Sequence, residues 1–201
     1  MSSPIKTVIR SMSELKAAEP SQLVLSFLNA IDDIFFESSA KKTFKDQAER
    51  DSFKYKYLGY YLEHHPELFL VCYDENQWKA AGPSNELLGY ICGSPDTLKD
   101  TELVELNPYL EIFKTEYESY PAHLHINCHA RARGKGIGSR LISSFESSLK
   151  NFEVNGISVK GLHLITSPEA RNVGFYERNG YTDKHVKSLS GNDLLLMGKT
   201  L

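Results

Sequence analysis

The sequence has few residues of the kinds that specify a disulfide framework or a membrane span. Its only cysteines are Cys72, Cys92 and Cys128, which are odd in number and far apart. Such spacing fits free thiols in a reducing compartment better than a disulfide framework or a zinc site. No apolar run approaches the ~20 residues that a bilayer span requires, and the N-terminal stretch lacks the pattern of a signal peptide. We therefore expect a cytoplasmic protein, with a nuclear location also open.

An excess of positive charge is lacking as well. The formal net charge is −3 at pH 7, which does not indicate a nucleic-acid-binding surface. We expect neither a nucleic acid nor a membrane as partner. With 201 residues, of which 41% are hydrophobic, the chain is long enough to bury a sizeable core. We predict a single domain over residues 1–201.

The first third of the chain is mainly helical in pattern. A short β-like segment at 6–10 precedes a helix from Ser21, the expected cap, to about Phe36. Its apolar stripe consists of Leu23, Phe27, Ile31 and Ile34. A second helical stretch runs from about 43 to 65 and carries aromatic residues that we interpret as core. Pro66 then ends the helix.

The rest of the chain alternates between strands and helices. Two β-rich runs, 68–73 and 87–92, are joined by a connection with glycine, proline and asparagine, which indicates a hairpin. An irregular or helical insertion over 96–117 follows. The remaining predicted elements are strand 123–129, helix 137–150, strand 161–166, helix 168–179, and strands 181–187 and 194–198. This order predicts an α/β (α+β) fold, a mixed sheet flanked by helices on both faces, with a parallel pair near its middle.

The segment RARGKGIGSRL, residues 131–141, lies between a predicted strand and a predicted helix. Glycines at a helix N-terminus let an anion approach the backbone N–H groups, and the helix dipole favours negative charge there. Pyrophosphate is the natural ligand, and Arg131, Arg133, Lys135 and Arg140 add complementary charge. A P-loop is excluded because Gly136, not Ser or Thr, follows Lys135. A dinucleotide fingerprint is excluded by the glycine spacing and by the late position in the chain.

Arg133, Gly136 and Gly138 fit the pattern Arg/Gln-x-x-Gly-x-Gly, and about 35 residues later the chain reads NVGFYERNGY. Together these motifs resemble the GNAT superfamily of N-acetyltransferases. The resemblance implies that the loop holds the pyrophosphate of acetyl-CoA and that strand residues 126–128 pair with its pantetheine arm. The coenzyme-binding residues it implies are Ile126, Cys128, Arg133, Gly134, Lys135, Gly136, Ile137, Gly138, Ser139, Asn172, Phe175 and Tyr176.

Two closer resemblances concern amino sugars. The string at Asn172–Tyr176 is similar to that of glucosamine-6-phosphate N-acetyltransferases. The segments HHPELFLVCYDE, LLGYICGSPD, YPAHLHI and LLLMGKTL resemble the acetyltransferase-like domain of O-GlcNAcases and its free-standing microbial relatives. This chain has Asn127 where those relatives typically carry Asp, and Ala130 where they carry Pro. The first change puts the acceptor chemistry in doubt, whereas the intact glycine loop supports coenzyme binding.

The resemblance also implies catalytic roles. Tyr176 is the candidate general acid toward the leaving thiolate, because a phenol with a pKa near ~10 matches a thiol. Strand alternation puts His123, His125, Asn127 and His129 on one face. We expect His125 and Asn127 to be catalytic, and His125 is our first candidate for the base. His163 is a weaker candidate, and a water chain remains open. We expect no metal site, and we interpret Cys128 as strand packing because direct transfer needs no covalent intermediate.

We predict an acetyl-CoA-dependent N-acetyltransferase that acts on a small amine, with an amino sugar favoured. Two alternatives remain open. One is a histone or protein lysine acetyltransferase, to which the acidic insertion points weakly. The other is a pseudo-acetyltransferase that binds coenzyme A and regulates a partner. The sequence leaves the oligomeric state undecided, and a homodimer is a guess.

Overall fold

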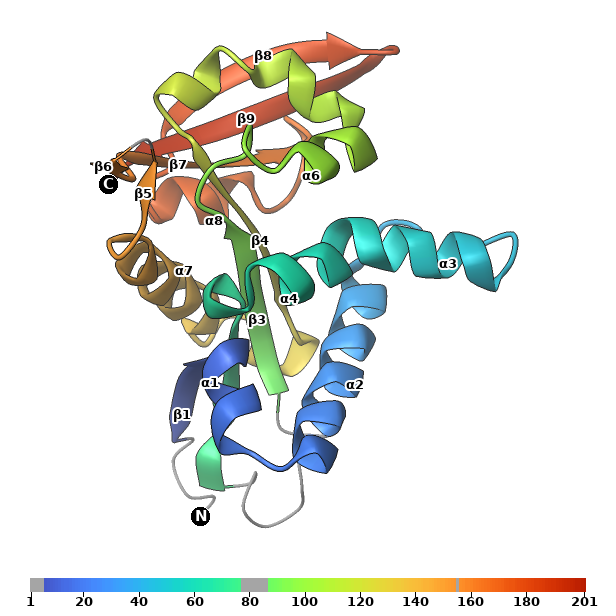
Figure 1. The fold of residues 1–201 in the computed structure, drawn as a ribbon. Coiled ribbons are helices and arrows are strands. Elements are labelled where there is room, and N and C mark those ends of the chain that lie inside the picture. Colours follow the sequence, from blue (N-terminus) through green and yellow to red (C-terminus); the bar gives the residue numbers. More distant parts are fainter. Residues whose placement is uncertain (1–5, 77–86, 155) are drawn as a thin grey trace. The chain divides into compact units, whose positions relative to one another are not determined.

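A computed structural model describes residues 6–76, 87–154 and 156–201 of the chain (Figure 1). Seven strands form one mixed sheet in the order β1-β2-β3-β4-β7-β9-β8. The chain divides into two compact units. Unit 1 comprises Met1–Cys92 with Ile126–Phe145, and unit 2 comprises Gly93–His125 with Glu146–Leu201. The prediction of a single domain stays a prediction.

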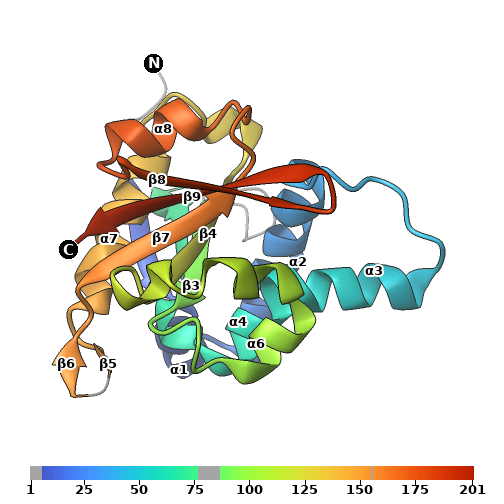
Figure 2. The same cartoon turned by 90° about the horizontal axis from the view of Figure 1, so that it is seen from above.

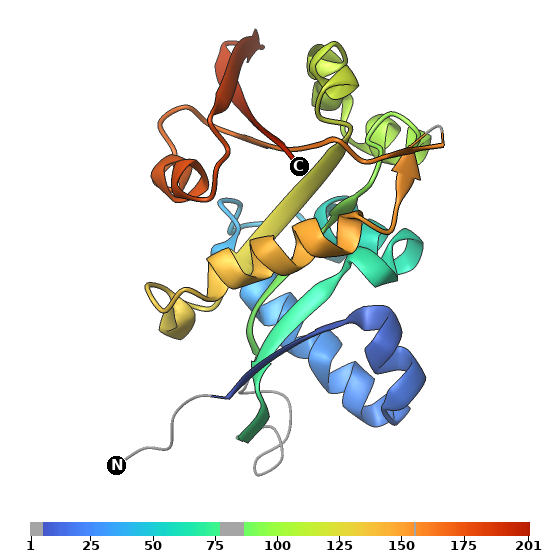
Figure 3. The same ribbon diagram turned by 90° about the vertical axis from the view of Figure 1, so that its left-hand side faces the viewer.

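Unit 1 contains strands β1 (Thr7–Ser11), β2 (Leu70–Asp74) and β3 (Leu87–Ser94), with the end of β4 (Ala122–Cys128). β1 runs antiparallel to β2 (Figure 3). β2 also runs antiparallel to β3, which confirms the hairpin predicted for the runs 68–73 and 87–92. The connection predicted between β2 and β3 falls mostly on 77–86, outside the described residues. The described helices of unit 1 include α1 (Met12–Ala18), α2 (Ser21–Ser38), α3 (Gln47–Lys54), a π-helical turn (Tyr55–Gly59), α4 (Tyr60–His64), a 3-10 turn (Pro66–Leu68) and the start of α7 (Ile137–Leu149).

Local sequence explains where these helices begin and end. α1 starts at a capping box, since the Ser11 hydroxyl accepts from the Glu14 amide (3.1 Å) and the Ser11 amide donates to the Glu14 carboxylate (2.9 Å). Pro20, and not Ser21 as predicted, is the N-cap of α2. The stretch predicted as one helix from 43 begins only at Gln47, because the Asp46 side chain caps it by accepting from the Glu49 amide.

Helices cover both faces of the sheet of unit 1. The ring of Phe27 on α2 lies 5.4 Å from that of Tyr73 on β2. On the opposite face, Arg140 of α7 is close enough to Cys72 to oppose the rise in pKa that burial gives this thiol, which reaches about 11. The core of the unit includes Phe27, Ile31 and Phe69, which are fully buried.

Unit 2 is built on the hairpin of β8 (Asp183–Leu189) and β9 (Asn192–Thr200), with β9 antiparallel to β7 (Gly161–Thr166) (Figure 2). β7 is parallel to β4 at Ala122 and His123, which confirms the predicted parallel pair. The insertion forms α6 (Thr101–Leu106) and two 3-10 turns, Pro108–Phe113 and Glu116–Glu118. The remaining elements are α8 (Val173–Arg178) and a short hairpin of β5 (Glu153–Val154) and β6 (Ile157–Ser158).

Several predicted helices and strands have different bounds from those expected, and the differences are clearest in α8, β8 and β9. α8 covers six residues, and not the whole of 168–179, because 167–172 form turns before it. β8 starts two residues later than predicted and β9 is longer at both ends. α1 and the β5–β6 hairpin were not predicted, because neither segment is long enough to show a clear period.

Candidate functional site

The turn that follows β4 is organised by its own side chains. After Cys128 the chain forms a 3-10 turn at Ala130–Ala132, and the Nδ1 atom of His129 accepts from the Arg131 amide (3.2 Å). The sequence placed His129 on the polar face of the strand. That prediction is wrong, since His129 lies beyond the strand and caps the turn.

The glycine loop exposes backbone N–H groups. Gly134 and Gly136 have φ values of 71° and 75°, a region that residues with side chains rarely adopt. Apart from the glycine and its two chain neighbours, no heavy atom of the described residues lies within 4 Å of a Cβ built at either position. α7 begins directly afterwards at Ile137, and its first helical bond runs from the Arg140 amide to the Gly136 carbonyl (3.1 Å). The N–H groups of Ile137, Gly138 and Ser139 therefore lack a partner within the helix. The structure gathers the predicted loop residues 133–139 at the N-terminus of a 13-residue helix.

The four cations of the loop fall into two pairs. A guanidinium nitrogen of Arg131 donates to the Leu87 carbonyl (3.3 Å), and Arg140 donates to the Thr7 hydroxyl. Both side chains hold the loop to neighbouring strands. Arg133 and Lys135 are exposed, and neither side chain has a hydrogen bond or ion pair within the part of the chain that the structure describes. Positive charge is thus available at the loop from these two residues.

Cys128 and Gly89 lie on one face of the sheet of unit 1. A Cβ built on Gly89 would meet the Asn127 carbonyl oxygen at 2.8 Å and the Cys128 Sγ atom at 3.0 Å, so the strands approach closely there. Burial raises the pKa of the Cys128 thiol to about 11, although Arg133 opposes this. A protonated thiol is a poor nucleophile, in agreement with a packing role. The predicted pairing of 126–128 with pantetheine stays a prediction.

Asn127 lies on the opposite face from Cys128 and contacts a residue that sequence reasoning missed. Its Nδ2 atom donates to the Tyr90 hydroxyl on the adjacent strand (2.8 Å). Tyr90 is fully buried, and its ring stacks on Phe69 with centroids 5.4 Å apart. The only sequence signal for Tyr90 is its position in a strand next to that of Asn127.

Unit 2 contains a cluster of three imidazoles. His123 Nδ1 shares a hydrogen bond with the Thr97 hydroxyl (2.9 Å), and His163 Nδ1 bonds to the Tyr120 carbonyl (2.7 Å). The ring of His123 lies 5.7 Å from that of His125 and 5.8 Å from that of His163. The structure therefore confirms that these histidines share one face and adds Thr97 and Tyr120 as partners.

Burial keeps two of these imidazoles neutral. It lowers the pKa of His125 to about 4. It lowers the pKa of His163 to about 4 as well, even though the carbonyls of Tyr120 and Ala122 favour the cation. His125 is thus in the neutral form that a base requires, but its conjugate acid would be strong. His163 is fully buried and stacked on Tyr117, with centroids 4.6 Å apart.

The second motif forms a compact group around α8 in unit 2. Asn172 precedes the helix, and its Oδ1 atom accepts from the Thr166 hydroxyl (3.3 Å). Tyr176 is buried, with its ring 5.2 Å from that of Phe175 and 6.1 Å from that of Tyr181. These contacts show a packed helix, and the acid role of Tyr176 stays a prediction.

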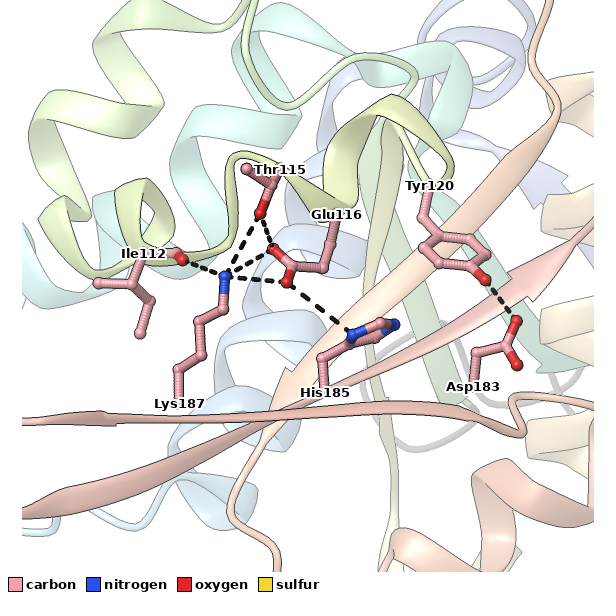
Figure 4. A network of polar contacts seen from close by, with 7 residues as sticks. All are labelled: Ile112, Thr115, Glu116, Tyr120, Asp183, His185 and Lys187. Carbon is pink, nitrogen blue, oxygen red and sulfur yellow. Dashed lines mark hydrogen bonds and ion pairs between the residues drawn. The ribbon is translucent and has the colours of Figure 1, made fainter.

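The insertion is fastened to one face of β8 by alternate residues of that strand (Figure 4). The Lys187 ammonium donates to the Ile112 carbonyl (2.8 Å) and pairs with the Glu116 carboxylate at 2.8 Å, while His185 lies 3.9 Å from the same carboxylate. The Tyr120 hydroxyl donates to Asp183. Several acidic residues of the insertion had suggested a groove for basic peptides, but Glu116 is occupied by internal partners.

No group of three metal-ligating side chains occurs within residues 6–76, 87–154 and 156–201. Within the same ranges, no helix combines the length and apolar character needed to cross a bilayer.

Residues 65–183 match the family model described as an acetyltransferase (GNAT) domain, a range that covers more than half of the chain. The structure is similar to a crystal structure of SsHAT, with a TM-score of 0.65 and 22% sequence identity, over 96% of this chain and 98% of the other. It is also similar to the paia N-acetyltransferase of Thermoplasma acidophilum in complex with coenzyme A, with a TM-score of 0.50 and 16% identity, over 98% and 100% of the two chains. A ribosomal-protein-alanine N-acetyltransferase from Brucella melitensis gives a TM-score of 0.50 at 19% identity, over 96% and 99%. At such identities the likeness concerns the fold.

Proposed function

The chain belongs to the GNAT acetyltransferase family and is an acyltransferase, and from this membership we propose that it transfers the acetyl group of acetyl-CoA to the amine of a small acceptor. We propose an amino sugar of the glucosamine type as that acceptor. The observation that carries the proposal is the glycine loop at the start of α7, where backbone N–H groups lie beside two exposed cations that have no partner among the described residues.

The loop fits a pyrophosphate in charge and in shape. A helix N-terminus stabilises negative charge through its dipole and its N–H groups without helical partners. Side chains at Gly134 and Gly136 would project into the space that the loop leaves open. We assign the pyrophosphate to the amides of 134–139 and to the side chains of Arg133 and Lys135. Coenzyme A supplies the thioester that makes the acetyl group transferable.

Acetyl transfer requires that the amine lose a proton and that the departing thiolate gain one. The phenol of Tyr176 is our candidate for the second step, and the neutral imidazole of His125 is our candidate for the first. Because the pKa of His125 is lowered to about 4, we expect it to hand the proton on to solvent and not to retain it.

The preference for an amino sugar rests on sequence resemblance alone. The NVGFY string resembles glucosamine-6-phosphate N-acetyltransferases, and longer segments resemble the acetyltransferase-like domain of O-GlcNAcases. Fold likeness carries no information on substrate. The free thiols of Cys72, Cys92 and Cys128 suit the reducing cytoplasm or nucleus that we propose as its location.

A thiol-release assay with acetyl-CoA and a panel of amines tests the proposal. Release with glucosamine supports it, and release only with histone peptides would replace the amino sugar with a protein lysine. If the protein bound coenzyme A but released no thiol from acetyl-CoA with any of the amines, the transferase function would be rejected and a coenzyme-binding regulator favoured.

The role of Tyr176 is tested by Tyr176→Phe. Loss of the proposed general acid should lower kcat about 100-fold or more, while the affinity for acetyl-CoA stays nearly unchanged. Tyr181→Phe is the matched control, since it removes the hydroxyl of a neighbouring buried tyrosine that bonds to Glu146 (3.1 Å). Equal kcat values in the two variants would remove Tyr176 from the acid role.

A further inference from the structure

Asn127 and Tyr90 form a polar pair on the face of unit 1 that α2 covers. Tyr90 on β3 is paired with Val71 on β2. Its ring stacks on Phe69, which lies two residues before Val71 and therefore on the same face of the sheet. Asp32 of α2 is close enough to contribute to the raised pKa of Tyr90. Cys128 lies on the other face, beside Gly89. Asn127 therefore faces away from the helix α7 that begins at the glycine loop.

The contact uses only one side of the Asn127 amide. Nδ2 donates to the Tyr90 hydroxyl at 2.8 Å. Nδ2 and Oδ1 project to opposite sides of the amide carbon, so Oδ1 points away from Tyr90. Within the described part of the chain, Oδ1 accepts no hydrogen bond, and the partly exposed side chain can be reached by a ligand. An oriented acceptor oxygen is thus available.

Tyr90 is suited to holding this amide in place. Its ring is 1% exposed and stacked on Phe69, so its hydroxyl has little freedom to move. Burial raises the pKa of the phenol well above 10, and the group remains neutral at physiological pH. The hydrogen bond to Asn127 therefore persists over that range. A rigid partner reduces the ordering cost of binding at Oδ1.

We propose that Asn127 Oδ1 accepts a hydrogen bond from the amino group of the acetyl acceptor and that Tyr90 is the positioning residue that orients it. This inference rests on the proposed function. An amide oxygen can hold an N–H group at any pH without removing its proton, so Asn127 selects a hydrogen-bond donor and leaves proton transfer to another group. The presence of Asn in place of a carboxylate is then compatible with an active transferase.

Substitution of the hydroxyl alone provides the first test. Tyr90→Phe should raise the KM for glucosamine about tenfold, the usual effect of one weakened hydrogen bond, and leave the KM for acetyl-CoA unchanged. Tyr73→Phe is the matched control, because it removes the hydroxyl of a buried tyrosine on the adjacent strand that interacts with Arg10. Equal KM values for glucosamine in the two variants would overturn the role of Tyr90.

The second test separates a positioning role from a structural one. Asn127→Ala should raise the KM for glucosamine at least as much as Tyr90→Phe, and the double variant should be no worse than Asn127→Ala alone. Asn127→Asp, which keeps an acceptor oxygen, should restore glucosamine binding. Additive effects in the double variant, or no restoration by Asp, would overturn the proposal.

A binding measurement makes the result independent of turnover. In the wild-type protein with coenzyme A present, added glucosamine should shift the NMR signals of the Asn127 side-chain amide. A shift without thiol release would support the acceptor site while rejecting the transferase function. Thiol release from acetyl-CoA in the presence of glucosamine, without any such shift, would overturn the acceptor site and leave the transferase function intact.

Discussion

The glycine loop of unit 1 and the histidine cluster of unit 2 both combine the residue types of a functional site, yet they differ in what their polar groups contact. In the loop, Arg133 and Lys135 are exposed and have no hydrogen bond or ion pair to any described residue. In the cluster, His163 is buried, stacked on Tyr117 and bonded to the Tyr120 carbonyl. The loop therefore leaves two cations available for contact with a ligand. In the cluster, the Nδ1 atoms of His123 and His163 already bond to neighbours, and only the buried Nε2 atom of His163 lacks a partner among the described residues of the cluster.

This difference shows that residue type is a weaker guide to function than the partners of a side chain. Three histidines in one strand segment attract more attention than one asparagine, because imidazoles titrate near neutral pH. In the structure His129 caps a turn and His123 bonds to Thr97, while Asn127 retains an accessible oxygen. Burial, which removes the ready titration of His163, is a tertiary effect.

The largest expected effect concerns the histidine cluster, where the buried His163 should make the free energy of unfolding depend on pH. An unfolded chain carries a histidine pKa near ~6.5, whereas that of His163 is about 4 in the folded chain. Between these values the unfolded chain binds a proton that the folded chain does not, so the free energy of unfolding falls as the pH drops through this window. Protonation of His163 should lower the free energy of unfolding by a total on the order of 3 kcal/mol. Urea unfolding at several pH values measures this decrease.

His163→Gln supplies the matched comparison, because glutamine is polar but does not titrate. The slope of its free energy of unfolding against pH should be smaller than that of the wild type, by an amount that corresponds to the uptake of up to one proton on unfolding. Identical slopes would mean that His163 is protonated alike in both states, and the contrast between the cluster and the loop would lose its basis.

The next largest effect concerns the loop backbone. Gly136→Val would place a side chain at a φ of 75° and at the surface where the amides converge, so we expect acetyl-CoA affinity to fall about 100-fold. Gly191→Val carries comparable strain at a φ of 81° in the β8–β9 turn. Calorimetric titration should show unchanged affinity for this control, and a weak effect of Gly136→Val would reject the loop as the pyrophosphate site.

The smallest effect distinguishes the two pairs of cations. Arg133→Ala and Lys135→Ala should each weaken acetyl-CoA binding about tenfold. The difference in affinity between each variant and the wild type should be smaller at high salt. Arg131→Ala should act mainly on stability, because its guanidinium bonds to the Leu87 carbonyl. If Arg131→Ala weakened binding as much as Arg133→Ala at equal thermal stability, the division of the cations would be wrong.

Elements with a clear period could be predicted from the sequence. β7 was predicted with its observed bounds, and α7 differs from the prediction by one residue, because long apolar patterns leave few alternatives. The stretch from 43 to 65 was predicted as helix, but its start at the Asp46 cap and its π-helical turn at Tyr55–Gly59 were not. Those features depend on local hydrogen bonding that periodicity does not report.

Some residues of the candidate site could likewise be predicted from the sequence, and others could not. The loop residues 133–139 could be placed together because they are consecutive and lie between a strand and a helix. Tyr90 could not be linked to Asn127, since they are 37 positions apart and only the pairing of strands brings them together. Likewise, the sequence shows four cations in the loop but not which of them bond to β1 or β3.

By itself, the sequence determined the mixed α/β fold, the position of the glycine-rich turn that we propose as an anion site, and the resemblance to acetyltransferases, because each depends on residues close together in the chain. Only the tertiary structure decided which polar groups remain open to a ligand. It buried His163, fastened Arg131 and Arg140 to strands, and left Arg133, Lys135 and the Asn127 oxygen without internal partners among the described residues. The physical reason is that exposure and hydrogen bonding depend on neighbours brought together by folding, which no local pattern encodes.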